Sequence, residues 1–378
     1  MYATQWKTYL MSKTKKIQVT KTYLPDLERY HTLLEEIWER SWVTNNGPLV
    51  DRLEQRLCAE LGVDHLSYVS NGTIALQLAL KALGVTGSVV TTPYSYVATT
   101  NAILAEHLHP IFVDIDECSF NVDPQKVEAA LRPDTSALLV THVYGYPCDH
   151  DALKEIAERH GLLLIYDAAH AYGVRHRGRA LVSYGDAATL SFHATKVFHT
   201  IEGGAVVVHR PERQETVKHY RSFGHVGPTH YNAGINGKNS ELHAGVGLLN
   251  FELLEKNHHA RRTISERYDD LLGQSDLLDL HFSDYEDLEY NYAYYPVLFT
   301  DHGSRERAVR ALNRENIFPR RYFTPSLNTL PYLSEYEPAP CPVSEDICQR
   351  VLCLPLYPDL ELADVDRIAG IVLQSKRP

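Results

Sequence analysis

The fold of this chain is predicted by one stretch, LLLIYDAAH, at residues 162–170. Its first four residues are aliphatic without a polar position, so a strand formed by them would be buried on both faces. Strands that read as continuous apolar runs belong to parallel sheets with helices on both sides. Ligands of such sheets bind beyond the carboxyl ends of the strands, which makes Asp167 a candidate site residue.

Short apolar runs alternate with helical patterns on both sides of this stretch. Further strands are predicted at residues 88–92, 110–115, 136–142, 188–192 and 205–209. Helices are predicted at residues 73–83, 97–107, 124–131 and 151–160, and another begins at Pro25-Asp26. Gly84 and Gly161 end the first and the last helix of the series as C-caps. The pattern predicts an α/β fold with a mostly parallel sheet.

The pattern of predicted elements changes after about residue 250. Helical stretches at 252–273 and 304–316 flank a strand at 294–299, and a segment rich in proline and tyrosine follows at 319–358. A chain of 378 residues is too long for one ordinary core. We therefore expect three parts: an N-terminal arm at 1–25, a large domain at 26–252 and a small C-terminal α/β domain at 253–378.

Composition excludes several classes of function. The formal charge of −11 disfavours a nucleic-acid or membrane surface, both of which select basic faces. No run approaches the roughly 18 apolar residues of a membrane span. The six cysteines have no spacing typical of a metal site and fit reduced thiols in the cytoplasm. The first twenty residues suggest a loose leader, in which Met11 is a second candidate start.

Two residues carry the candidate chemistry. Asp167 ends an apolar strand, where a carboxylate is costly to bury without a cationic partner such as a protonated pyridine nitrogen. A helix N-cap is the alternative for Asp167. Lys196 ends the segment SFHATK, just beyond the strand at 188–192. A lysine that forms an imine needs a fixed, partly desolvated amine, whereas a solvated surface charge is the alternative.

Other segments supply parts of a cofactor site. Gly72 and Thr73 open an apolar helix, whose N-terminus favours an anion such as a phosphate, with Ser191 as a further contact. Ordinary helix caps are the alternative there. Tyr96 follows the strand at 88–92 and could stack on a planar ring, or pack in the core. The order of these pieces along the chain predicts a complete cofactor site.

These segments resemble the sugar aminotransferases of the DegT/DnrJ/EryC1/StrS family. The similarity runs over nearly the whole chain through the segments NGTIAL (71–76), TPYSYVAT (92–99), VDID (113–116), HVYG (142–145), DAAHA (167–171) and SFHATK (191–196). It implies the aspartate-aminotransferase-like fold of pyridoxal-5′-phosphate (PLP) transferases of fold type I. It also implies a homodimer with active sites at the subunit interface, and pyridoxamine phosphate as the intermediate form of the cofactor.

The resemblance assigns roles residue by residue. Lys196 would hold PLP as an imine and act as the acid/base catalyst, and Asp167 would pair with the ring nitrogen. His170, where the family often has glutamine, would lie near the ring hydroxyl. The other expected cofactor contacts are Tyr96 on the ring, Gly72, Thr73 and Ser191 on the phosphate, and Asn236 on the neighbouring subunit's phosphate. Gly237 and Lys238 depart from the family's Asn-Tyr-Arg pattern, which leaves the role of Lys238 open.

The resemblance also implies a substrate. Lys196 argues against the members that carry histidine there and remove a hydroxyl. His193 resembles members that aminate C4 of a nucleotide-linked 4-keto-6-deoxyhexose, such as dTDP-4-keto-6-deoxyglucose, with L-glutamate as donor. Candidate sugar-nucleotide contacts are Asn45, Asn46, His193, Arg320 and Tyr322.

Two alternatives stay open at this point. One is another PLP enzyme, such as a C3 sugar aminotransferase, a dehydratase or an aminotransferase of small amino acids. Another is a non-enzymatic sensor of PLP or sugar. A nicotinamide oxidoreductase is disfavoured, because no Gly-x-Gly-x-x-Gly follows a predicted strand.

Overall fold

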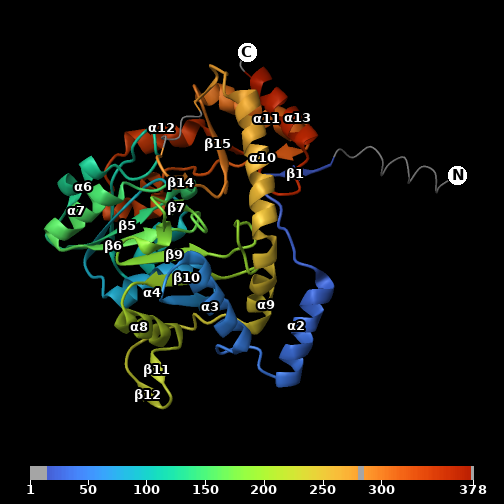
Figure 1. Ribbon diagram of the computed structural model, residues 1–378. Coiled ribbons are helices and arrows are strands. Elements are labelled where there is room, and N and C mark those ends of the chain that lie inside the picture. Colours follow the sequence, from blue (N-terminus) through green and yellow to red (C-terminus); the bar gives the residue numbers. More distant parts are fainter. Residues whose placement is uncertain (1–14, 280–284, 376–378) are drawn as a thin grey trace.

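The computed structural model describes residues 15–279 and 285–375, and a seven-stranded sheet lies at the centre of its N-terminal part (Figure 1). The strand order is β2-β10-β9-β6-β5-β3-β4. The bounds are β2 (Leu66–Val69), β3 (Ser88–Thr91), β4 (His109–Phe112), β5 (Thr135–Thr141), β6 (Leu163–Asp167), β9 (Ala187–Ser191) and β10 (Gly204–Val208). β10 is antiparallel to both neighbours, while β9, β6, β5, β3 and β4 pair in parallel. The mostly parallel sheet is thus confirmed, and β2 is a strand that the sequence patterns did not predict.

Both faces of this sheet are buried, as the apolar run at its centre predicts. On β6, Leu164 and Tyr166 belong to one hydrophobic cluster, whereas Ile165 belongs to the cluster on the opposite face. Helices flank the sheet: α4 (Gly72–Leu83), α5 (Ala98–Ala105), α6 (Pro124–Ala130), α7 (His150–His160) and α8 (Pro211–Arg221). Gly84 and Gly161 are left-handed C-caps of α4 and α7, as predicted.

Three further helices pack beside the sheet. α2 (Leu27–Arg40) begins after Asp26, whose side chain accepts a hydrogen bond from the Arg29 amide. α3 (Pro48–Leu61) and α2 both contact α9 (Glu241–Asn250). The buried carboxylate of Glu241 accepts hydrogen bonds from the amides of Leu49 and Val50, so α9 caps the N-terminus of α3.

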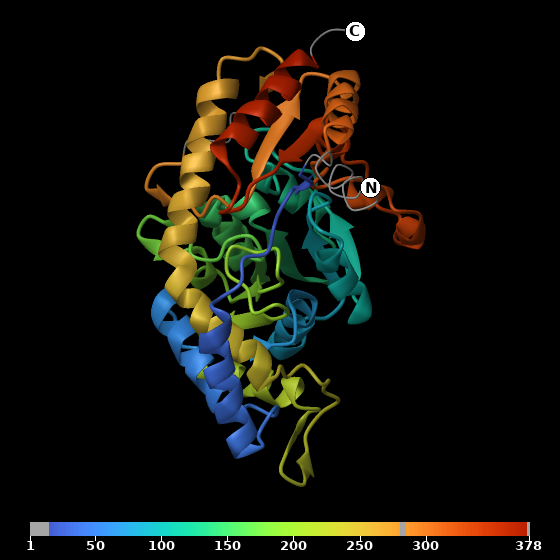
Figure 2. The same cartoon turned by 90° about the vertical axis from the view of Figure 1, so that its right-hand side faces the viewer.

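The C-terminal part has its own core. A three-stranded sheet, in the order β13 (Leu278–Asp279), β15 (Tyr295–Phe299), β17 (Val351–Leu354), packs with helices around a separate hydrophobic cluster. The helices are α10 (Leu254–Leu272), α11 (His302–Arg314), α12 (Pro342–Arg350) and α13 (Leu362–Gln374). Figure 2 shows α10, in gold, running alongside both parts of the chain. The domain bounds 26–252 and 253–378 remain a prediction.

The N-terminal segment joins this C-terminal core. β1 (Ile17–Gln18) pairs in parallel with β16 (Ile317–Phe318), and Ile17 is fully buried in the C-terminal cluster. The expectation of a loose leader is therefore wrong at residues 17–18, because a distant strand holds them, and residues 1–14 lie outside the described part.

Short elements complete the fold. β14 (Leu288–Glu289), β7 (Arg175–His176) and β8 (Arg179–Ala180) form a small sheet, and β11 (His225–Val226) pairs with β12 (Thr229–His230) in a hairpin. The 3₁₀ turns are η1 (Val143–Gly145), η2 (Leu181–Ser183), η3 (Phe251–Leu253), η4 (Leu327–Thr329) and η5 (Pro331–Tyr336). Within residues 15–279 and 285–375, no helix is long and apolar enough to cross a membrane.

Candidate active site

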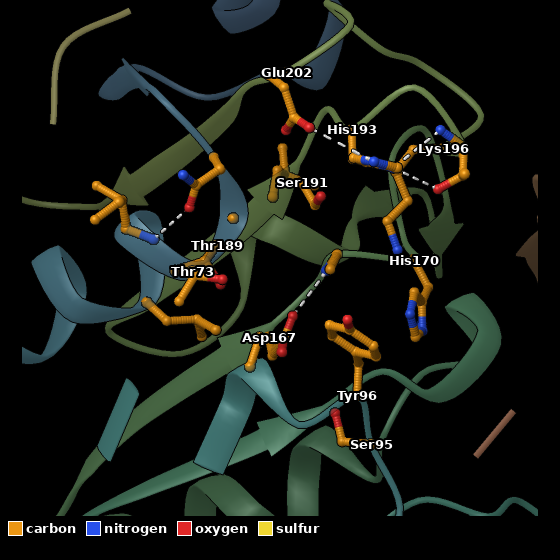
Figure 3. A pocket seen from close by; sticks show the side chains of 18 of the residues that line it. Thr73, Ser95, Tyr96, Asp167, His170, Thr189, Ser191, His193, Lys196 and Glu202 are labelled. Carbon is orange, nitrogen blue, oxygen red and sulfur yellow. Dashed lines mark hydrogen bonds and ion pairs between the residues drawn. The ribbon is translucent and has the colours of Figure 1, made fainter. Parts of the chain in front are cut away.

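A cavity of about 650 Å³ lies where the carboxyl ends of β6 and β9 meet the N-terminus of α4 (Figure 3). This is the edge of the sheet at which the parallel topology predicts a ligand. Many of the predicted residues line it: Gly72, Thr73, Tyr96, Asp167, His170, Ser191, His193, Lys196 and Tyr322. Residues from 72 to 322 thus contribute to one cavity.

Asp167 is the last residue of β6 and is buried. Its Oδ1 accepts a hydrogen bond from the Ala169 amide at 3.1 Å, and its Oδ2 accepts one from Thr99 Oγ1 at 2.7 Å. Burial raises the pKa of this carboxyl, while the bonds from Thr99 and Ala169 and the charge of Lys196 oppose the shift. The alternative of a helix N-cap is wrong, because no helix follows Asp167 in residues 168–174.

Lys196 reaches the same cavity from the loop after β9. Its Nζ lies 3.3 Å from the hydroxyl of Tyr294, within hydrogen-bond distance. Burial lowers the pKa of Lys196 to about 8, and the charge of Asp167 opposes the shift. Lys196 is partly buried and lines the cavity, so it is not a solvated surface charge. A large share of the amine is neutral near pH 8, which is the form that attacks a carbonyl.

His170 is buried beside Asp167, and its ring stacks on Phe323 with centroids 5.5 Å apart. Its Nδ1 is buried without a hydrogen-bond partner. Burial lowers the pKa of His170 well below its ordinary value, so the ring is neutral. His170 also lines the cavity, so the edge of its ring that meets the cavity can hydrogen-bond a ligand hydroxyl.

The N-terminus of α4 forms a second wall. Asn71 caps the helix by accepting a hydrogen bond from the Ile74 amide at 2.9 Å, so capping and ligand binding are compatible here. A Cβ on Gly72 would lie 2.9 Å from Ser191 Cβ, so only glycine lets these segments approach so closely. The first amides of a helix lack intrahelical partners and attract anions.

Two side chains stand at the mouth of the cavity. Tyr96 is 61% exposed, which rules out the alternative of core packing and leaves its ring free to cover a ligand. His193 Nε2 lies 3.6 Å from Glu202 Oε1, and both residues line the cavity (Figure 3).

The other predicted contacts lie elsewhere. Arg320 lines a neighbouring cavity of about 900 Å³, which shares Tyr96 and Tyr322 with the first. Asn45 and Asn46 form a turn with positive φ, outside the lining of either cavity. Asn236 is exposed and accepts a hydrogen bond from Lys238 at 2.8 Å, also away from both linings.

Sequence reasoning missed two residues of the site. Thr99 lies in the quoted segment TPYSYVAT, but nothing in its spacing indicates that its hydroxyl reaches Asp167. Tyr294 lies in a run of tyrosines before β15, where no pattern distinguishes it from Tyr292 or Tyr295. Only the tertiary structure identifies these two residues as part of the site.

The cavity fits PLP by the chemistry of its walls. A buried carboxylate, a lysine with a lowered pKa and a neutral imidazole in the lining match the ring nitrogen, the aldehyde and the ring hydroxyl respectively. The α4 N-terminus with Ser191 matches the phosphate. No cluster of three or more metal-ligating side chains occurs among the residues that the structure describes.

Comparisons with known proteins identify the family of the chain. The model of the DegT/DnrJ/EryC1/StrS aminotransferase family matches residues 27–373. The dTDP-4-amino-4,6-dideoxy-D-glucose transaminase of Shigella dysenteriae is 39% identical over 96% of this chain and 100% of its own length. The enzyme of that name from Escherichia coli is 38% identical over 95% and 98%.

Solved structures show the same fold. DesI, crystallised with its TDP-sugar product, has a TM-score of 0.91 and 32% identity, covering 97% of this chain and 94% of its own. The aminotransferase TlmJ from Streptoalloteichus hindustanus has a TM-score of 0.89 and 28% identity, covering 96% and 99%. The prediction of fold type I is thereby confirmed. This chain belongs to the DegT/DnrJ/EryC1/StrS aminotransferase family and is a PLP-dependent aminotransferase.

Proposed function

We propose that this enzyme transfers the amino group of L-glutamate to C4 of dTDP-4-keto-6-deoxyglucose. The observation that carries the proposal is the cavity that unites Lys196, Asp167 and the N-terminus of α4. The substrate rests on the two transaminases that are 39% and 38% identical over nearly their full lengths. The lysine at position 196 agrees with amine transfer rather than dehydration.

Three residues of the cavity have proposed roles in this reaction. PLP, when bound, supplies an electron sink for the electrons released at the reacting carbon. Lys196 Nζ takes the proton from Cα of glutamate in the first half-reaction and delivers a proton to C4 of the sugar in the second. Positioned acid/base groups of this sort contribute roughly 10²–10⁴ in rate. Asp167 would hold the proton of the ring nitrogen, and the neutral His170 would hydrogen-bond the ring hydroxyl.

The neighbouring cavity supports a sugar nucleotide. Lys16, Arg320 and Arg321 line it, and cationic side chains match a diphosphate. Tyr96 and Tyr322 belong to both cavities, so a ligand could extend from one to the other. His193 and Glu202 are proposed as contacts of the sugar ring. Asn45 and Asn46 remain proposed contacts that would act across a subunit interface.

A homodimer is part of this proposal. Exposed apolar side chains gather on two elements at the outer surface: Leu27 and Trp38 on α2, and Phe223, Val226 and Tyr231 in and around the β11–β12 hairpin. Such surfaces commonly mark protein interfaces. Asn236 lies beside the hairpin segment, bridged to Ser222, where it could reach a neighbour's phosphate.

We place the reaction in the cytoplasm, in the synthesis of an amino sugar for a surface polysaccharide such as O-antigen or for a glycosylated metabolite. All six cysteines are free thiols, which suits a reducing compartment. The proposed partners are the two substrates and a second copy of the chain, with no nucleic acid or membrane.

The decisive experiment follows the visible spectrum of the purified protein with PLP. A yellow band should appear, bleach when L-glutamate is added, and return when dTDP-4-keto-6-deoxyglucose is added. Mass spectrometry should then detect dTDP-4-amino-4,6-dideoxyglucose. Bleaching without recovery would retain the transaminase and discard the sugar, and absence of the band would overturn the PLP site.

Two controls sharpen this experiment. Lys196→Ala should lose turnover by at least about 10²-fold, because the acid/base group is gone, and should release PLP on gel filtration. A GDP-linked 4-keto-6-deoxy sugar tests the nucleotide, since GDP-perosamine synthases of 29–33% identity are also relatives. Equal turnover of both nucleotides would reject specificity for dTDP.

A further inference from the structure

Three buried hydroxyl groups form a chain that ends on Asp167. Thr99 Oγ1 lies 2.7 Å from Asp167 Oδ2, and Ser95 Oγ lies 2.7 Å from Thr99 Oγ1. Thr141 Oγ1 lies 3.0 Å from Ser95 Oγ. These three residues are at most 3% exposed, so water does not compete for their bonds. Two of them come from the β3–α5 region and one from the end of β5.

The hydrogen bonds of this hydroxyl chain can run in one direction, in which each hydroxyl donates its single proton once. A hydroxyl has a single proton, and the Thr99 proton donates to Asp167 at 2.7 Å rather than to the Tyr96 carbonyl at 3.2 Å. Ser95 then donates to Thr99, and Thr141 donates to Ser95. Three aligned O–H dipoles therefore point at one carboxylate oxygen, and hydrogen bonds in such chains strengthen one another.

The geometry favours an ionised carboxylate. The Ala169 amide donates to Oδ1 while Thr99 donates to Oδ2, so each oxygen of Asp167 accepts at least one bond from the protein. Acceptance of hydrogen bonds favours the charged form, which burial disfavours. A protonated Asp167 would instead have to use one oxygen as a donor and disturb this arrangement.

We propose that Thr99, supported by Ser95 and Thr141, is a positioning residue that keeps Asp167 ionised and fixed at the cavity wall. The inference deepens the proposed function, on which it rests, because Asp167 must be charged to pair with the ring nitrogen of PLP. Thr99 thus acts on the cofactor through the carboxylate without touching the reacting atoms.

Four other titratable side chains line the cavity with Asp167 and are unchanged in every variant of this test. They come from four elements packed around it: Lys196 after β9, His170 after β6, Tyr96 before α5 and Tyr294 before β15. The ring of His142, after β5, stacks on Tyr166 at 4.4 Å. Since none of them changes, a shift between variants reports on the hydroxyl chain.

The test is a PLP titration of the full-length protein, freed of cofactor and followed by absorbance between pH 5 and 9. Thr99→Val should raise the PLP dissociation constant roughly 10- to 100-fold at neutral pH, since a hydrogen bond to a charged group is lost. The pH below which affinity declines should also move upward, because the carboxyl of the variant stays protonated to higher pH. Thr99→Ser should restore both quantities.

Thr100→Val is the matched control. Thr100 is the next residue, is equally buried, and its hydroxyl has no hydrogen-bond partner. This variant should bind PLP as the wild type does. A loss confined to thermal stability in Thr99→Val, with unchanged affinity and unchanged pH profile, would overturn the proposal.

Two outcomes separate this inference from the proposed function. Wild-type protein that fails to bind PLP would refute the cofactor site itself, whereas equal binding by wild type and Thr99→Val would refute only the role of Thr99. If Thr99→Val does not fold, Ser95→Ala removes the second donor of the chain and should shift the pH profile in the same direction by less. If the pH profile of Ser95→Ala does not shift, the proposed role of the hydroxyl chain is rejected.

Discussion

The amine of Lys196 lies 3.3 Å from the hydroxyl of Tyr294, although 98 residues separate them in the chain. The ring of Tyr294 is also near the aromatic ring of His170, with centroids 4.9 Å apart. Burial raises the pKa of the Tyr294 phenol, so the phenol stays neutral and can donate to or accept from the amine. The C-terminal part of the chain thereby holds the lysine of the N-terminal part in place.

Tyr294→Phe should lower kcat by about fivefold to tenfold, because one hydrogen bond to the reacting amine is lost while the ring remains. PLP should still bind, since Lys196 is intact. Steady-state kinetics with separate kcat and KM check this, and Tyr292→Phe, outside the cavity lining, is the control. An unchanged kcat in Tyr294→Phe would show that the contact has no role in turnover.

Asp167→Asn should have opposite effects on activity and on stability. Loss of the charged partner should reduce turnover by about 10²-fold or more, as for other buried charge pairs that lose one member. The raised pKa of Asp167 means that its ionisation costs stability in the cofactor-free protein as pH rises above the unfolded value. The cofactor-free variant should therefore melt at a higher temperature than wild type at pH 8. A lower melting temperature would contradict the assigned cost of burying this charge.

Gly72→Ala should weaken PLP binding at least about tenfold, because its Cβ would lie 2.9 Å from Ser191 Cβ and force the phosphate wall apart. Gly370→Ala is the control. Gly370 lies in α13 with nothing near its would-be Cβ, so alanine should be neutral or should stabilise by up to about 1 kcal/mol. Absorbance titration measures the PLP affinity of both variants, and thermal melting measures their stability. Equal affinity in the two variants would show that the α4 N-terminus does not hold the cofactor.

Acid should destabilise the protein through histidines buried near the sheet. Burial lowers the pKa of His150 to about 3 and that of His142 well below its usual value, and their rings lie 5.3 Å apart. His150 takes up a proton below about pH 6.5 in the unfolded chain, but only near pH 3 in the folded chain. This histidine therefore costs about 1.4 kcal/mol of unfolding free energy per pH unit in that window, and His142 acts in the same direction.

Urea unfolding at pH 7.5 and pH 5 measures this loss. His150→Phe keeps a ring against Tyr184, on which His150 stacks at 3.8 Å, and should lose less stability between the two pH values than wild type. His31→Gln, at an exposed position, should behave as wild type. An identical pH dependence in His150→Phe would assign the acid sensitivity to other groups.

The sequence alone determined the α/β class and the principal residues of the site. An aliphatic run such as residues 162–165 has one stable place, the middle of a sheet covered on both faces, so β6 and its position followed directly. Asp167 and Lys196 lie just after strands, and parallel strands bring their carboxyl ends to one edge. Local patterns were sufficient to predict buried strands and helix ends, because both depend on residues that are neighbours in the sequence.

Only the tertiary structure decided which distant groups touch. The parallel pairing of Ile17 with Ile317, the contact of Lys196 with Tyr294 and the hydroxyl chain from Thr141 to Asp167 join segments with no local signal in common. Hydrogen bonds of side chains depend on distances of a few tenths of an ångström between packed elements, and no periodicity encodes them. The sequence thus identifies the residues of the site, whereas packing determines the charges and hydrogen bonds around them.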